Sequence, residues 1–451
     1  MHTRLASAAF ITLSLLMSAS AIGQEQREKL PPHNANLSSL RDTPPVALKK
    51  QTDAAMTVIQ QQSERLPSDP LGRPSSDLSL PDTSSYGEFT IERRVFYDSE
   101  RDRSVATVIY VPVRATIAAP VLVFAEGGLS SATDFAELSE HLASRGFAVA
   151  VIERSVGHRS TDAELSSFSE VAGVQADAFI ERPRDVSFLL DELKRVSRSS
   201  RERFGIEIDL KKVGVVGHSF GGYTALALAG AQLNAESLSE TCQTASFISY
   251  LNNPSLRVQC SAQGIAERFN EPLKDERVRA VMAINPMGSR LFGDSGLSQV
   301  DVPVLMVAGS EDSVAPALLE PIEMFAGLEH PQAQPVVALV RGRDDLVVSY
   351  PQHYLAVIEG GNHLYALPDG SENDASVAGD LVTEEVDVAY DYLRALSIAF
   401  LNPEVAEYDG FRRGLTRDAL QLLSQPALPL HVVGYLTEDM LGADNLGVVE
   451  P

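Results

Sequence analysis

From residue 86 onward, short runs of apolar residues alternate with segments of helical periodicity. The β-branched stretches EFTIERRVFYD and VATVIYVPV flank the charged turn SERDRS and predict a hairpin. Later runs predict six more strands, within PVLVFAEGG, FAVAVIER, KVGVVGHS, RVRAVMAINP, VPVLMVAGS and HYLAVIEGG. Helical periodicity predicts helices within DFAELSEHLASRG, where Gly146 ends the helix, and within RPRDVSFLLDELKRVSRS, GGYTALALAGAQ and VDVAYDYLRALSIAFL.

Buried strands that alternate with helices are typical of the α/β class. We therefore expect a mostly parallel sheet of eight strands with helices on both faces. In such a sheet, ligands bind beyond the carboxyl ends of the strands. Candidate active residues should accordingly come directly after strands.

The first 85 residues differ from this pattern. MHTRLASAAFITLSLLMSASAIGQ has a basic start, a short apolar stretch and a small-residue cleavage site, which predicts a signal peptide over residues 1–21. Its apolar stretch is shorter than the roughly 20 residues of a membrane anchor. Residues 22–85 are rich in Pro, Ser, Asp and Gln and are interpreted as an extended arm, with one short helix near 47–62. We expect a secreted or periplasmic protein whose main domain spans residues 86–451.

Composition and charge limit the classes of partner that the protein can bind. Hydrophobic residues make up 44% and charged residues 22%, as in soluble globular proteins. The net charge of −24 argues against nucleic acid and against an anionic membrane surface. The two cysteines, Cys242 and Cys260, have 17 residues between them and predict a disulfide in an oxidising compartment, two buried thiols being the alternative. This neighbourhood offers too few ligands for zinc, so no metal site is expected.

GHSFG, residues 217–221, lies between a predicted strand and a predicted helix. A sharp turn here lifts a serine hydroxyl above the sheet, and it needs glycines because a β-carbon on either side would clash. The helix also points its amino end at developing negative charge. The motif and its setting make Ser219 a candidate nucleophile.

A serine nucleophile needs a base and an acid that orients the base. After two later predicted strands come GSEDSVAP and GGNHL, in the order acid and then histidine. We assign Asp312 as the acid and His363 as the base, with Glu311 and the RGRDD aspartates (Asp344 and Asp345) as alternatives to Asp312. The remaining histidines, including His218 beside the serine, are interpreted as structural.

A tetrahedral intermediate needs two N–H donors for its oxyanion. Phe220, directly after the nucleophile, is expected to supply one. The loop after PVLVFA is expected to supply the other, and we favour Gly128.

These motifs resemble the α/β-hydrolase family over roughly residues 86–400. Within it, FAELSEHLASRGFAVA, RPRDVSFLLDEL, GVVGHSFGGYTALALAG and VPVLMVAGSEDSVAP resemble esterases of the dienelactone-hydrolase-like or platelet-activating-factor-acetylhydrolase-like group. The resemblance implies an α/β-hydrolase fold and ester hydrolysis through an acyl-serine, without metal or organic cofactor. Relatives often carry His-Gly where this chain has Glu126-Gly127. Because a carboxylate close to the oxyanion would repel its negative charge, the Glu126 side chain is expected to turn away from it.

Two insertions into the predicted pattern lie beside the site. Residues 233–275 hold both cysteines and the apolar FISYL, and are expected to form a cap over the pocket or a satellite subdomain; residues 328–352 form the second. The expected substrate is a small-molecule ester or a lipid-like ester. The alternatives are a lipase or polyester hydrolase, and a non-catalytic homologue that binds a ligand or partner.

Overall fold

The structure, a computed structural model, describes ten stretches of the chain, all within one unit that begins at Leu37. They are residues 37–68, 87–113, 118–127, 135–153, 174–197, 207–330, 337–339, 346–348, 350–363 and 385–441. The predicted signal peptide lies outside them.

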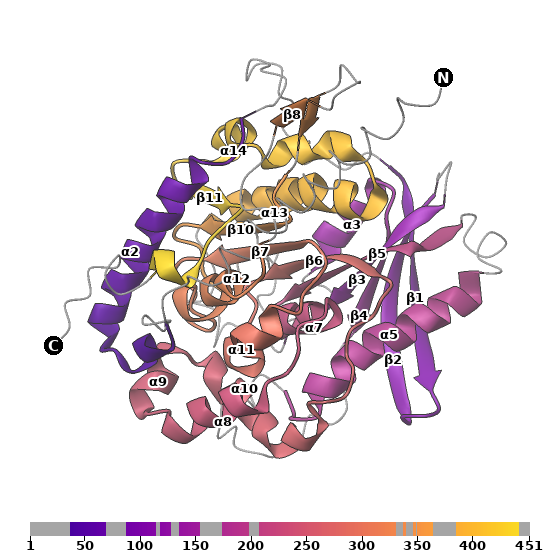
Figure 1. Ribbon diagram of the computed structural model, residues 1–451. Helices are drawn as coiled ribbons and strands as arrows, with labels where there is room; N and C mark the ends of the chain where they lie inside the picture. Colours follow the sequence, from indigo (N-terminus) through magenta and orange to yellow (C-terminus); the bar gives the residue numbers. More distant parts are fainter. Residues whose placement is uncertain are drawn as a thin grey trace, which may run out of the picture. The chain divides into compact units, whose positions relative to one another are not determined.

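A nine-stranded sheet forms the centre of the fold, in the order β1-β2-β4-β3-β5-β6-β7-β10-β11 (Figure 1). Its strands are β1 (Phe89–Asp98), β2 (Arg103–Pro112), β3 (Ala119–Ala125), β4 (Ala148–Glu153), β5 (Ile208–His218), β6 (Val278–Ile284), β7 (Val304–Gly309), β10 (His353–Ile358) and β11 (Leu430–Val433). The six from β4 to β10 pair in parallel, and β1, β2 and β11 pair antiparallel with their neighbours. The prediction of a mostly parallel sheet is confirmed.

Alternation along the strands divides the core in two. In β3, Val121 and Val123 face one layer of helices, whereas Leu122 and Phe124 face the other. The first layer holds α5 (Ala178–Ser197), α7 (Phe220–Leu228), α11 (Ser289–Leu297) and α12 (Glu323–Ala326); the second holds α3 (Ala136–Ser144), α13 (Val386–Leu401) and α14 (Arg417–Leu423). Figure 1 shows α3 and α13 on one side of the sheet and α7 and α11 on the other.

Apart from the helices of the arm and of the insertion, given below, the remaining elements are short. They are η5 (Leu318–Ile322), η7 (Asn402–Ala406), η8 (Asp409–Leu415), η9 (Glu438–Leu441) and a separate two-stranded sheet of β8 (Val337–Leu339) and β9 (Leu346–Val348). The predicted helix stop is confirmed, since Gly146 has φ +97°, which L side chains rarely adopt.

Two expectations need correction. The main sheet has nine strands instead of eight, because β11 adds an antiparallel edge beside β10. The arm is also less extended than expected: besides the helix expected near 47–62, which is α2 (Pro45–Ser63), it holds η1 (Leu37–Asp42), and α2 packs against β11. Helix α2 buries Leu48, Ala55 and Ile59 in the main core, at intervals of seven and four residues, so these residues share one face of the helix.

The predicted disulfide is confirmed. Cys242 and Cys260 are bonded, with their Cα atoms 5.7 Å apart. The bond ties α8 (Ala235–Thr244) to α10 (Ser255–Ser261), with α9 (Phe247–Asn252) between them and η4 (Ala262–Arg268) after them. Residues 233–275 therefore form a helical insertion that a covalent cross-link holds together.

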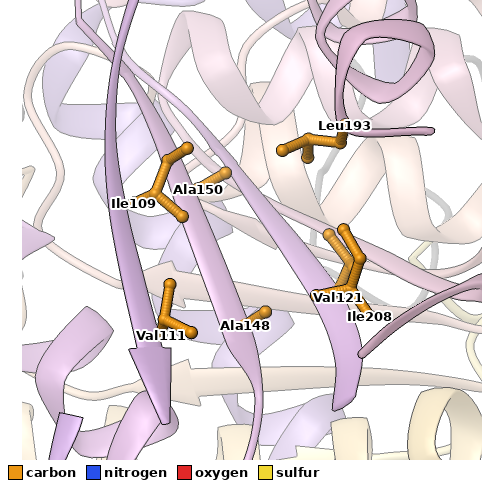
Figure 2. A pocket seen from close by; sticks show the side chains of 7 residues that line it. All are labelled: Ile109, Val111, Val121, Ala148, Ala150, Leu193 and Ile208. Carbon is orange, nitrogen blue, oxygen red and sulfur yellow. The ribbon is translucent and has the colours of Figure 1, made fainter. Parts of the chain in front are cut away.

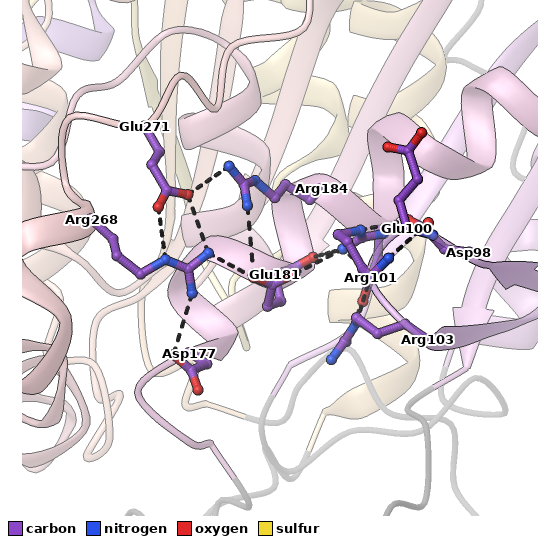
Figure 3. A network of polar contacts seen from close by, with 10 residues as sticks. Asp98, Glu100, Arg101, Arg103, Asp177, Glu181, Arg184, Arg268 and Glu271 are labelled. Atoms are coloured by element: carbon purple, nitrogen blue, oxygen red, sulfur yellow. Dashed lines mark hydrogen bonds and ion pairs between the residues drawn. The ribbon is translucent and has the colours of Figure 1, made fainter.

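An ion-pair network joins the insertion to the edge of the sheet (Figure 3). Arg101, in the β1–β2 turn, contacts Asp98 at 2.6 Å, Glu181 of α5 at 3.0 Å and Asp185 of α5 at 2.8 Å. Arg268 of η4 contacts the same Glu181 at 2.8 Å. The arginines hold the pKa of Glu181 below its ordinary value against the opposing effect of burial. The network thereby fastens three segments that are distant in sequence.

A small apolar cavity lies between the sheet and α5, lined by side chains of β2, β4, β3, β5 and α5 (Figure 2). The space that a water-sized sphere can reach is about 10 Å³. That is room for about one water molecule, and the lining offers it no polar partner. The cavity is therefore a packing defect of the core and not a substrate pocket.

Candidate active site

Ser219 sits on a strained turn between β5 and α7. Its backbone has φ +55° and ψ −116°, a conformation that is costly for a residue with a side chain. A β-carbon on Gly217 would lie 2.0 Å from the carbonyl oxygen of Gly221, and one on Gly221 would lie 1.9 Å from that of Ala125. The requirement for glycine on both sides of the serine is thus confirmed, and it comes from backbone packing.

The structure brings the three predicted triad residues together. The Nε2 atom of His363 lies 3.1 Å from the hydroxyl oxygen of Ser219, and its Nδ1 atom lies 2.7 Å from Oδ2 of Asp312. A carboxylate only accepts hydrogen bonds, so Nδ1 carries the proton and Nε2 accepts from the serine hydroxyl. Ser219 is 8% exposed, and the side chains of His363 and Asp312 are 1% exposed. This is the arrangement in which a histidine can remove the proton of a serine.

Backbone donors orient the acid. The N–H groups of Val314 and Ala315 each donate to Oδ1 of Asp312 at 2.8 Å, which leaves Oδ2 for His363. Glu311, the neighbouring candidate for the acid, is an exposed side chain 3.8 Å from Lys49. The two RGRDD aspartates lie outside the described residues. The geometry therefore selects Asp312 as the partner of His363.

The candidate oxyanion donors are only partly described. Phe220 is the first residue of α7, where a backbone N–H has no acceptor within the helix. Gly128 lies outside the described residues. Just before it, Arg182 of α5 donates to the carbonyl of Glu126 at 3.0 Å, and its guanidinium lies 4.7 Å above the Phe220 ring. Glu126 is buried, and the expected direction of its side chain stays a prediction.

Two residues beside the triad are not singled out as functional by the sequence. His218, interpreted from its position as structural, has its Nε2 atom 2.8 Å from the backbone carbonyl oxygen of His363. Burial and the neighbouring His363 lower the pKa of His218 to about 3, so it stays neutral at working pH. Asn285, directly after β6, donates to the same carbonyl at 3.0 Å. Its place directly after a predicted strand is the one sequence signal that could draw attention to Asn285.

A buried carboxylate anchors the insertion near the acid loop. Glu320 is fully buried and accepts five hydrogen bonds, from Asn253 Nδ2 (2.6 Å), Ser255 Oγ (3.0 Å), Gln259 Nε2 (2.5 Å) and the N–H groups of Gly288 (2.9 Å) and Ser289 (3.0 Å). The N–H of Ser255 also donates to the carbonyl of Val314, two residues after Asp312. The insertion is thus hydrogen-bonded directly to the segment that carries the acid.

Within the described stretches, no three or more His, Cys, Asp or Glu side chains gather as metal ligands would. Over the same stretches, no helix combines the length and apolar character that crossing a bilayer requires.

The fold and the site together define a class of protein. A parallel sheet carries a serine on a sharp strand-to-helix turn, and an acid and a histidine that are hydrogen-bonded to each other follow later strands; this is the arrangement of α/β-type hydrolases. Comparison with family models agrees: residues 122–441 match the alpha/beta hydrolase family. The chain belongs to this family, and the expected fold class is confirmed. No curated protein matches the sequence significantly.

Proposed function

We propose that the chain is an exported serine hydrolase that cleaves carboxylic esters through an acyl-Ser219 intermediate. The observation that carries the proposal is the continuous hydrogen-bonded line from the Ser219 hydroxyl through His363 to Asp312. Membership of the alpha/beta hydrolase family supports hydrolysis as the reaction class.

In the acylation step, Nε2 of His363 takes the hydroxyl proton while Ser219 Oγ forms a bond to the ester carbonyl carbon. Negative charge moves to the carbonyl oxygen, where the N–H of Phe220 and, as predicted, that of Gly128 would stabilise it. The carbon–oxygen bond to the alcohol then breaks, and the alcohol leaves with the proton from His363. Asp312 stabilises the imidazolium that forms in between.

Deacylation reverses the roles. A water molecule gives a proton to Nε2 of His363 as its oxygen bonds to the acyl carbon. The bond to Ser219 Oγ breaks, and the serine recovers the proton from His363. The carboxylic acid leaves, and the balance of the two steps is one ester plus one water giving one acid plus one alcohol.

The resemblance to dienelactone-hydrolase-like and platelet-activating-factor-acetylhydrolase-like esterases supports a small or lipid-like ester as the substrate. A second candidate, a lipase or polyester hydrolase, is favoured by one observation: α9 of the insertion exposes Phe247 to 75% and Leu251 to 57%. Side chains of this kind suit contact with a water-insoluble ester. The proposed export rests on the leader pattern in residues 1–21, and the disulfide suits an oxidising compartment.

The test is turnover of p-nitrophenyl esters of graded acyl length by the wild type and by Ser219→Ala. The matched control is Ser397→Ala, which removes a fully buried serine hydroxyl from α13. We expect Ser219→Ala to lower kcat by about a million-fold, with the control close to wild type. A preference for short chains supports the esterase, and a preference for long, insoluble esters supports the second candidate. A folded wild type without turnover would favour the non-catalytic homologue.

A further inference from the structure

We propose that Asn285 and His218 together form a clamp on the backbone carbonyl of His363 and thereby position the imidazole of the general base. The inference rests on the proposed function, because it assigns a role within that reaction. The clamp consists of these two side chains and the one carbonyl oxygen that both of them contact.

Asn285 joins three strand ends at one point. Its Nδ2 donates to the carbonyls of Asn362, at 2.9 Å, and His363, at 3.0 Å. Its Oδ1 accepts from the N–H of Gly309, at the end of β7, at 2.9 Å. The residue itself follows β6 and is fully buried. The ends of β6 and β7 and the turn after β10 are therefore held at fixed separations by one amide.

The backbone of Asn285 supports the same conclusion. Its φ is +41°, in the left-handed region that residues with side chains rarely occupy. Asparagine tolerates this region better than most residues, but the conformation is still strained. Such strain persists only where the surrounding structure fixes it, and here it turns the amide toward the His363 carbonyl.

His218, the last residue of β5 and the neighbour of Ser219, supplies the second donor. Its Nε2 lies 2.8 Å from the carbonyl oxygen of His363; because that oxygen can only accept, Nε2 carries the proton and donates. The two imidazole rings lie 4.8 Å apart. Burial keeps His218 neutral, so it does not repel the positive charge that His363 acquires during each step. A protonated neighbour at this distance would oppose that charge.

The clamp matters because the His363 ring must satisfy two contacts at once, at 3.1 Å to Ser219 and at 2.7 Å to Asp312. The ring follows its own backbone, so a shift of the carbonyl moves both contacts. A displacement of about 1 Å can cost about a hundred-fold in rate. Two donors on one carbonyl restrict that movement without touching the ring nitrogens, which leaves both of them available for the reaction.

The experiment compares Asn285→Asp, His218→Phe and His218→Gln with the wild type. Asn285→Asp keeps the shape and the acceptor for Gly309 but loses the amide donor, and His218→Phe keeps a ring but loses its donor. His218→Gln retains an N–H donor at the same number of bonds from the backbone. The control is Asn402→Asp, since Asn402 is a buried asparagine whose Nδ2 donates to the carbonyl of Ile398 at 3.2 Å, outside the triad.

Two rates are measured on each folded protein: fluorophosphonate labelling, and kcat with KM on a p-nitrophenyl ester. We expect Asn285→Asp and His218→Phe to lose about ten- to a hundred-fold in labelling rate and in kcat, with KM within about twofold. His218→Gln should recover most of the loss. The loss in the double variant Asn285→Asp/His218→Phe should differ from the product of the single losses, because both side chains hold one atom.

The clamp would be overturned if both Asn285→Asp and His218→Phe had labelling rates and kcat values within about twofold of wild type. An equal loss in Asn402→Asp would also overturn it, because that would mark a general effect of buried asparagine. If Asn285→Asp does not fold, the His218→Phe and His218→Gln pair still decides, because an equal loss in both removes the donor argument. If the wild type itself neither labels nor turns over, it is the proposed function that fails, and the clamp is rejected with it.

Discussion

Replacement of His353 by phenylalanine should reduce the loss of unfolding free energy that accompanies a fall from pH 8 to pH 5. This histidine begins β10 and is 1% exposed, and its burial, reinforced by the neighbouring His330, lowers its pKa to about 3. In the unfolded chain its pKa returns to about 6.5. Between these two values the unfolded state binds a proton that the folded state does not. The folded state therefore loses stability as pH falls below about 6.5, and this loss continues down to about pH 3.

The magnitude can be worked from these values. At pH 5, about 1.5 units below the unfolded pKa, the unfolded state gains about 2 kcal/mol from this one group, at about 1.4 kcal/mol per pH unit. In His353→Phe the gain is absent. We therefore expect the loss in unfolding free energy between pH 8 and pH 5 to be about 2 kcal/mol smaller in the variant than in the wild type.

The assay is urea unfolding followed by circular dichroism at pH 8 and pH 5 for both proteins. For each protein we take the change in unfolding free energy between pH 8 and pH 5 and compare the two changes. The effect of the substitution on packing is the same at both pH values and therefore cancels. If the wild type and His353→Phe lose the same unfolding free energy between pH 8 and pH 5, then His353 has the same pKa in the folded and the unfolded chain. The reasoning from its burial would then be wrong.

Three further predictions concern the fold around the site. Replacing Cys242 and Cys260 by serine opens a loop of sequence separation 18 and should lower the free energy of unfolding by about 3 kcal/mol, measured by urea titration; a change below about 1 kcal/mol would argue against loop entropy as its source. Gly221→Ala should abolish fluorophosphonate labelling, because its β-carbon meets a backbone carbonyl at 1.9 Å; a labelling rate like that of the wild type would contradict this. Arg101→Ala, which leaves three carboxylates without this partner, should lower stability by about 2 kcal/mol or more in thermal melts, and an unchanged Tm would show the network to be dispensable.

The central strands and the helices between them could be predicted from the sequence because their apolar runs are long and nearly continuous. The triad could be predicted for a related reason: Ser219, Asp312 and His363 each follow such a strand, and parallel strands end at the same edge. The predicted helix within residues 386–401 has those same bounds in α13. Local pattern and tertiary structure agree at these positions.

The parts that could not be predicted depend on contacts distant in sequence. Strand β11 has only four residues, and its strand conformation comes from pairing with β10. The helix in the arm was expected, but its packing against β11 joins segments more than 350 residues apart. Asn285 gives no signal beyond its place after a strand, because its partners come from β7 and from the turn after β10.

The hydrogen bonds that converge on Glu320 could not be predicted from the sequence either. A glutamate within LLEPI is typical of a solvated charge, and carboxylates are seldom fully buried. Its burial becomes tolerable only because donors from residues 253–259 and 288–289 converge on it. No periodicity along the chain indicates that convergence.

The central claim is that Ser219 is a nucleophile activated by His363. The most direct measurement treats the purified protein with a fluorophosphonate probe and locates the adduct by tandem mass spectrometry, alongside Ser219→Ala and His363→Ala. The account predicts one adduct, on Ser219, that is absent from Ser219→Ala and forms far more slowly in His363→Ala. A folded wild type that takes up no probe, or an adduct on a different residue, would contradict it.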